Sequence, residues 1–370
     1  MNIKFKQDEI ILLVGAGASV DANIPDSTKM INEIERLLID DESWKEFSSL
    51  YNFIKSSIYY SDGIQGKFNN DVNFNIERLV NTLEEIRKKN QHTLYPFVGS
   101  WNPTLIEVAG NNFKMAEQLK NKTIETLRDR WIALENKADA EYYKGIINFQ
   151  AEYQFPLRIF SLNYDLCIEK ICGDSNPEYI ERGFDENCVW HWQRFIEIQE
   201  EPNIYLYKLH GSNDWKYEEN SRLIYRDAPS TIPHIETAII FGDVHKLQYI
   251  DPFLFLVYEF RKWSLESKMI LSIGYGFGDD HINGILSQAL NLNENRRLVS
   301  ISPGNPDEKE KEICDKLGIS KDRRQVKSIE STAKKFLMNN FTVQSLSEYL
   351  PEEEELFPDL LAEEELNPTN

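Results

Sequence analysis

Four short motifs in this chain combine glycines with side chains able to do chemistry, and each follows an apolar run. They are Gly-Ala-Gly-Ala-Ser at residues 15–19, Ser-Leu-Asn-Tyr-Asp at 161–165, Leu-His-Gly-Ser at 209–212 and Gly-Tyr-Gly-Phe-Gly-Asp at 274–279. Short apolar runs rich in Ile, Leu and Val predict buried strands of a parallel sheet. Open parallel sheets bind ligands at the carboxyl ends of their strands, so we expect the four motifs to meet at one edge.

The first motif has the composition of a loop that binds a diphosphate. Gly15 and Gly17 allow positive φ and a close approach of a ligand to the backbone, ahead of an expected helix. Such a glycine pair can also serve packing alone. Val20 stands where the dehydrogenase fingerprint has its third glycine, and no acidic residue ends a second strand about 20 residues later. A hydride-transfer dehydrogenase is therefore disfavoured.

The second and third motifs supply the candidate catalytic side chains. Asn163 and Asp165 stand two residues apart beyond a predicted strand, so alternation directs both to the same side. Asn163 can orient a water molecule or a ribose hydroxyl, whereas an Asx turn would use both side chains for local backbone contacts. His210, followed by Gly211, can serve as a general base toward a ribose hydroxyl or water. Asn163 and His210 are therefore our candidate catalytic residues.

The fourth motif predicts another close approach of backbone to a ligand. We expect Asp279 or Asp280 to favour the start of a helix through its dipole. Asp243 and His245 have the chemistry of metal ligands, but no further ligands stand at a suitable spacing, so we predict no metal site. The four cysteines form no Cys-x-x-Cys pair, which disfavours a zinc ribbon and a disulfide framework.

The apolar runs predict an α/β fold with a Rossmann-like, mostly parallel, six-stranded sheet. The predicted strands are residues 10–14, 157–160, 204–209, 238–241, 269–273 and 298–301. The long stretch between the first two has helical periodicity and far exceeds a simple crossover, so it predicts a large inserted helical lobe, with Ser27 as the cap of its first helix.

The predicted organisation has four parts. Residues 1–27 and 151–303 form the sheet domain, residues 28–150 the helical lobe, and residues 304–350 a set of C-terminal helices. Residues 351–370 contain eight acids and no base, which predicts a solvated, disordered tail, with a partner-docking peptide as the alternative.

Composition limits the partners and the location. Lys and Arg number 41 against 61 Asp and Glu, a formal charge of −20, which disfavours direct nucleic-acid binding. The first nine residues lack the basic start and long apolar run of a signal peptide. No run approaches the roughly 20 apolar residues that span a bilayer. We therefore expect a soluble, cytoplasmic protein.

Taken together, the motifs resemble those of the sirtuin superfamily, and more closely its bacterial sirtuin-like NAD hydrolase branch in anti-phage defence than the protein deacylases. Residues 15–19 match the family's Gly-Ala-Gly-x-Ser loop, 22–26 its Ala-Gly-Ile-Pro-Asp segment, and 241–243 its Phe-Gly-Glu strand end. Asn163 and Asp165 match its Gln-Asn-x-Asp motif, and His210 its catalytic histidine. The resemblance implies that NAD+ contacts Gly15, Ala16, Gly17, Ser19, Asp26, Asp165, Gly242, Gly274, Gly276 and Ser302.

The chain departs from the deacylase pattern in three respects. No cysteine lies between Ser212 and Thr237, where deacylases carry a zinc module. Ser27 replaces the family's Phe after Asp26, and Leu162 replaces the Gln before Asn163. The helical lobe would also cover the cleft where an acyl-lysine peptide enters, which leaves room mainly for NAD+ and water.

The resemblance therefore implies an NAD+ glycohydrolase, with NAD+ as substrate and no metal. Asn163 positions water and ribose, His210 takes a proton or orients the ribose, and Asp26 or Asp165 stabilises the developing positive charge. In the family, NAD+ depletion blocks phage propagation. The resemblance also implies a homo-oligomer that stays silent until triggered, with a partner such as a HerA-like ATPase or, less favoured, a short Argonaute. A protein deacylase and a non-catalytic scaffold that senses NAD or ADP-ribose are the alternatives.

Overall fold

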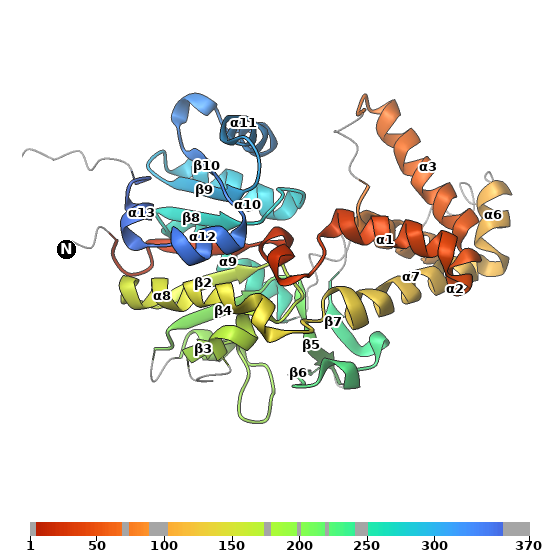
Figure 1. Ribbon diagram of the computed structural model, residues 1–370, viewed down its shortest axis with the longest axis horizontal. Helices are drawn as coiled ribbons and strands as arrows, with labels where there is room; N and C mark the ends of the chain where they lie inside the picture. The colour runs from red at the N-terminus through yellow and green to blue at the C-terminus, as the bar shows by residue number, and fades with distance from the viewer. Residues whose placement is uncertain are drawn as a thin grey trace, which may run out of the picture.

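The computed structural model describes residues 5–68, 74–88, 103–173, 179–197, 201–218, 222–240 and 251–350. Within them, a central sheet of seven parallel strands has the order β10-β9-β8-β1-β2-β4-β3 (Figure 1). Its strands are β1 Ile10–Val14, β2 Leu157–Ser161, β3 Ile180–Glu181, β4 Ile204–Lys208, β8 Met269–Ile273, β9 Arg297–Ser302 and β10 Val326–Glu330.

Helices cover both faces of this sheet, which explains why its central strands β1, β2 and β8 are buried throughout. Alternate residues of β1 enter opposite cores: Leu12 packs on one side and Leu13 on the other. The first face is covered by α8 (Lys144–Tyr153), α12 (Ala333–Asn339) and α13 (Val343–Ser347). The second is covered by α9 (Phe253–Glu266), α10 (Asp280–Leu292) and α11 (Pro306–Leu317).

The sequence predicts six strands for this sheet, and the sheet has seven. The two strands that the sequence does not predict are β3, which is two residues long, and β10, in which only Val326 is buried. Residues 304–350, predicted to be helices only, therefore contain a strand. The predicted parallel strand at 238–241 is also wrong, because β7 (Thr237–Ile239) belongs to a separate sheet.

That separate sheet is small, antiparallel and attached directly to His210. It has the order β6-β5-β7, with β5 Gly211–Tyr217 and β6 Leu223–Tyr225. Gly211 pairs with Ile239 at a φ of +87°, and a Cβ on Gly211 would lie 2.0 Å from the carbonyl oxygen of Ala238. Only glycine fits this close approach of two strands.

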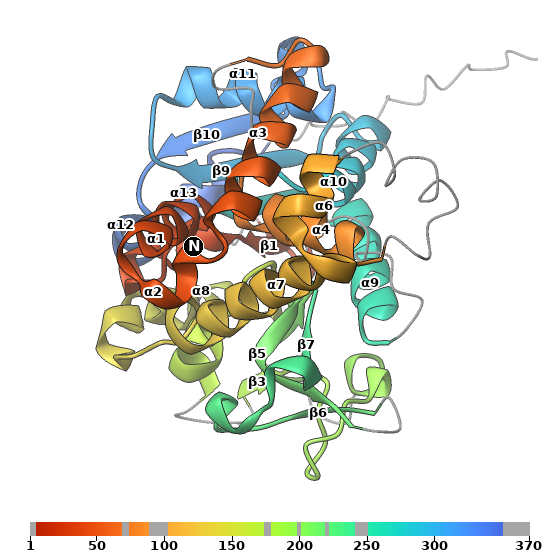
Figure 2. The same ribbon diagram turned by 90° about the vertical axis from the view of Figure 1, so that its right-hand side faces the viewer.

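A helical lobe separates β1 from β2 in the chain and stands beside the sheet, as Figure 2 shows from the lobe side. Its helices are α1 Ser27–Asp40, α2 Glu42–Lys45, α3 Ser48–Ile64, α4 Ile76–Arg87, α6 Pro103–Ala109 and α7 Lys114–Thr126. They share an apolar core of their own. Asp26, not Ser27, caps α1, because its carboxylate accepts from the Lys29 N–H at 2.9 Å, whereas Ser27 Oγ accepts from the Ile76 N–H.

Two predictions fall outside the described residues: the acidic tail at 351–370, and Gly242 together with Asp243 and His245. The domain boundaries stay a prediction. Among the described residues, no helix combines the length and the apolar character needed to cross a membrane.

Candidate active site

The four motifs lie at the carboxyl ends of neighbouring strands. Val14, the last residue of β1, is in register with Ser161 of β2 on one side and Ile273 of β8 on the other. Ser161 is in register with Lys208 of β4, so Asn163 and His210 each stand two residues beyond a paired position. Strand order reverses around β1, and such a reversal is where open parallel sheets bind ligands.

The two glycine loops pack backbone against backbone. The Gly17 N–H donates to the Gly274 carbonyl at 2.9 Å. Gly274 has a φ of +66°, and a Cβ there would lie 2.1 Å from the Ala18 nitrogen. Gly17 and Gly274 therefore pack the two loops together, and both also line the cavity between them. Gly276 is different, because a Cβ there would meet no atom within 4 Å.

A cavity of about 200 Å³ opens between these loops and the end of β9. It brings together four predicted ligand-contacting residues: Gly17, Gly274, Gly276 and Ser302. Gly15 is buried under the loop, and Ala16 is exposed.

Lys309 and Glu312 of α11 also line this cavity. Burial opposes ionisation of Glu312, but hydrogen bonds from Lys309 and Lys316 outweigh it and lower the pKa of the Glu312 carboxyl. The cavity therefore has a carboxylate on its α11 side.

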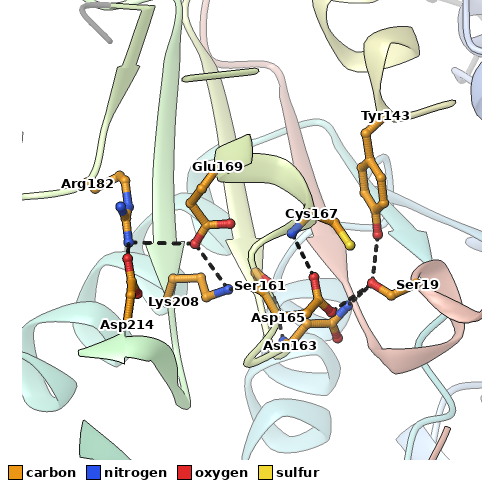
Figure 3. Close-up of polar contacts among 10 residues, drawn as sticks. All are labelled: Ser19, Tyr143, Ser161, Asn163, Asp165, Cys167, Glu169, Arg182, Lys208 and Asp214. Atoms are coloured by element: carbon orange, nitrogen blue, oxygen red, sulfur yellow. Dashed lines mark hydrogen bonds and ion pairs between the residues drawn. The ribbon is translucent and has the colours of Figure 1, made fainter. Parts of the chain in front are cut away.

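Ser19 organises a buried polar cluster next to these loops (Figure 3). Its hydroxyl donates to Asp165 Oδ2 at 2.8 Å and accepts from Asn163 Nδ2 at 3.1 Å. Because Ser19 has a single hydroxyl proton, the third contact, at 2.9 Å, must be donated by the Tyr143 hydroxyl. Burial, then the nearby Tyr142, raises the pKa of Tyr143 well above its ordinary value, so this donor stays protonated.

The cluster fixes the amide of Asn163 and leaves its oxygen without a partner. Asn163 is 7% exposed, and its Oδ1 accepts no hydrogen bond from any residue that the structure describes. A buried acceptor without a donor is costly. Asn163 Oδ1 is therefore the atom to which a water or hydroxyl donor would bind.

Asp165 takes part both in this cluster and in a local turn, since its other oxygen, Oδ1, accepts from the Cys167 N–H at 3.0 Å, as in an Asx turn. Burial, then the charge of Asp165, raises the pKa of the Cys167 thiol, so this cysteine stays protonated. Asp26, by contrast, is occupied with capping α1, and no hydrogen bond or ion pair among the described residues joins it to Asn163 or His210.

Asp279 forms a pair with His210 that the sequence does not predict. His210 Nε2 lies 3.1 Å from Asp279 Oδ2, and both side chains are buried. Asp279 Oδ1 accepts from the N–H groups of His281 and Ile282 and so caps α10, as expected. One carboxylate therefore caps a helix and lies within ion-pair distance of a histidine from another strand end. Its position at a glycine-rich strand end is the only sequence signal of this second contact.

Glu125, Asp129 and His234 form the one group of possible metal ligands among the described residues. Arg128 Nη1 lies 3.2 Å from His234 Nδ1. Since arginine only donates, Nδ1 must accept, and a neutral ring then carries its proton on Nε2, the nitrogen facing both carboxylates. His234 Nε2 lies 3.7 Å from Glu125 Oε1 and 3.9 Å from Asp129 Oδ2, which is too far for hydrogen bonds.

Residues 157–320 match the family model described as the SIR2-like domain, and this region contains Asn163, His210 and the second glycine loop. The match covers less than half of the chain and shows a similarity to the SIR2-like domain over these residues. A search of curated proteins found no match.

Solved structures supply distant similarities. A Sir2 homologue in complex with NAD is 10% identical over 92% of this chain and 90% of that chain, with a TM-score of 0.43. A mutant Sir2 homologue in complex with 2′-O-acetyl ADP-ribose is 10% identical over 93% of this chain and 94% of that chain, with a TM-score of 0.41.

Proposed function

We propose that this chain is an NAD+ glycohydrolase, which converts NAD+ and water into ADP-ribose, nicotinamide and a proton. The observation that carries the proposal is the unpartnered, buried Oδ1 of Asn163, two residues beyond β2. The His210–Asp279 pair lies at the same edge of the sheet, beyond the ends of β4 and β8. The match to the SIR2-like domain supports the choice of substrate.

In this reaction the bond between ribose C1′ and the nicotinamide nitrogen breaks, and its electron pair neutralises the pyridinium ring. The water oxygen then bonds to C1′. Asn163 Oδ1 accepts a hydrogen bond from that water or from a ribose hydroxyl, but an amide is not basic enough to take the proton. His210 takes the proton or orients the ribose, while Asp279 holds its ring. Asp165, in the Ser19 cluster, is better placed than Asp26 to stabilise the positive charge.

The biological role that we propose follows from the sequence resemblance. NAD+ depletion in the bacterial cytoplasm would block phage propagation, with the enzyme acting as a homo-oligomer that a HerA-like ATPase or, less favoured, a short Argonaute switches on.

Nicotinamide release from NAD+ tests the activity, with the purified protein alone and with a HerA-like ATPase. His210→Ala should lower turnover by about 100- to 10,000-fold, the range for a positioned acid–base group. Asn163→Ala should lower it by about 100-fold, because the water or ribose hydroxyl loses the group that positions it. Asp279→Asn should lower it less, because His210 remains. The matched controls are Asn203→Ala, at the opposite end of the sheet, and His191→Ala, which breaks the exposed His191–Asp185 pair.

The other outcomes separate the alternatives. Tight NAD+ binding with no nicotinamide release, unchanged by either substitution, would replace the hydrolase with a sensing scaffold. Nicotinamide release only when an acylated peptide is present would replace it with a deacylase.

A further inference from the structure

A buried lysine lies behind the candidate active site. Lys208, the last residue of β4, is 2% exposed and stands two residues before His210. Its Nζ donates to the carbonyl oxygen of Asp165 at 2.5 Å and lies 3.2 Å from Glu169 Oε1 (Figure 3). An ammonium group removed from water is costly unless it is paired and hydrogen-bonded, and Lys208 is both.

The pair extends into a network of four charges. Arg182 Nη2 lies 2.6 Å from Asp214 Oδ2 and 3.8 Å from Glu169 Oε1. Burial alone would lower the pKa of Arg182, but the charges of Asp214 and Glu169 outweigh it and raise this pKa. Arg182 therefore stays charged, and Glu169 Oε1 lies within ion-pair distance of both Arg182 and Lys208.

Backbone bonds join the same two segments. The Leu209 N–H donates to the Ser161 carbonyl at 2.9 Å, and the Asn213 N–H donates to the Tyr164 carbonyl at 2.9 Å. The donors flank His210 and the acceptors flank Asn163. The hydrogen bond from the Lys208 side chain to the Asp165 carbonyl joins the same two segments.

We propose that Lys208 is a positioning residue, whose ammonium group fixes the Asp165 carbonyl and thereby sets the place of Asn163 relative to His210. This inference rests on the proposed hydrolysis. Lys208 acts through the loop rather than on the substrate. A buried ion pair contributes little net stability compared with a well-packed apolar pair. We therefore expect the Lys208–Glu169 pair to act mainly on the geometry of the loop that carries Asn163.

Three proteins test this role against a purely structural one. Lys208→Met leaves Glu169 with Arg182 alone and should lower both stability and kcat. Lys208→Met combined with Glu169→Gln removes both charges and should recover most of the stability. The control, Arg158→Met combined with Asp8→Asn, removes a buried ion pair of β2 that lies toward the opposite end of the sheet.

The combined Lys208 and Glu169 variant should still have a kcat about 10- to 100-fold below wild type, with KM for NAD+ within about twofold, because a misplaced group costs turnover more than binding. Hydrogen exchange of a peptide spanning residues 161–167 should be faster in this variant. The control should keep the wild-type kcat and the wild-type exchange of that peptide.

If the combined Lys208 and Glu169 variant recovers kcat together with stability, the proposal is overturned. Unchanged hydrogen exchange of residues 161–167 in this variant would overturn it as well. If the wild type releases no nicotinamide under any condition, the proposed hydrolysis fails. The exchange comparison then still decides whether Lys208 holds the loop.

Discussion

Gly274 and Gly276 stand two residues apart in one loop, yet they face different surroundings. Gly274 needs its positive φ and its missing Cβ to pack on the first glycine loop. Gly276 has open space beside it and lines the cavity that also includes Ser302. Both glycines line the cavity, but only Gly274 also holds the two loops together.

Gly274→Ala should destabilise the protein, because the left-handed backbone costs about 1–2 kcal/mol for a residue with a Cβ, and the clash with Ala18 adds to this. Gly276→Ala should leave the free energy of unfolding within about 0.5 kcal/mol of wild type. If a dinucleotide occupies the cavity, Gly276→Ala should weaken ADP-ribose binding. Urea unfolding and calorimetry measure both quantities, and equal stability of the two variants would refute this assignment.

At the scale of elements, one side chain ties the helical lobe to the small sheet. Arg128, in the helical turn Leu127–Trp131 that follows α7, is buried and donates to the carbonyls of Ile232 and Pro229 at 2.9 Å each. Its Nε donates to Asn213 Oδ1 at 3.3 Å, and Asn213 holds the Tyr164 carbonyl. The lobe is thereby connected to the loop that carries Asn163.

Arg128→Met should lower the free energy of unfolding by about 1–3 kcal/mol, since it leaves carbonyl groups beside buried Ile232 without donors. It should also lower nicotinamide release, because Tyr164 lies next to Asn163. The control is Arg130→Met, which removes the ion pair between the exposed Arg130 and the half-buried Glu33 and should cost about 1 kcal/mol or less. Equal unfolding free energies of the two variants would contradict the anchoring role.

For the whole molecule, the sequence predicts the strands that short local patterns indicate. It misses the features that depend on residues far apart in the chain. Five strands of the sheet and their shared carboxyl edge follow from apolar runs and the residues after them. β10 is missed because an edge strand is half exposed, and β7 is misplaced because its partner β5 decides its sheet. The pairing of His210 with Asp279 depends on β4 and β8 sharing one edge, which no local pattern contains.

Buried tyrosines predict how the whole molecule responds to alkali. Burial raises the pKa of Tyr143 and of Tyr164 well above the ordinary value. In the unfolded chain these phenols ionise near about pH 10. The unfolded state then binds fewer protons than the folded state, so stability should be flat near neutral pH and fall above about pH 10.

Urea unfolding from about pH 8 to about pH 11 measures this dependence. Tyr143→Phe should make the fall shallower, whereas Tyr60→Phe, at an exposed position, should not change it. Stability that stays constant or rises across this interval would contradict the prediction.

The polar contacts of the carboxyl edge join residues made at very different times during translation. Ser19 contacts Tyr143 and Asp165, which are 124 and 146 residues further along, and Gly17 contacts Gly274. In a growing chain the first glycine loop therefore lacks its backbone partner, Gly274, until most of the chain has been made. Contacts of such long sequence separation form late in folding. The complete set of contacts at the carboxyl edge of the sheet can therefore form only after the segment that contains Gly274 has been made.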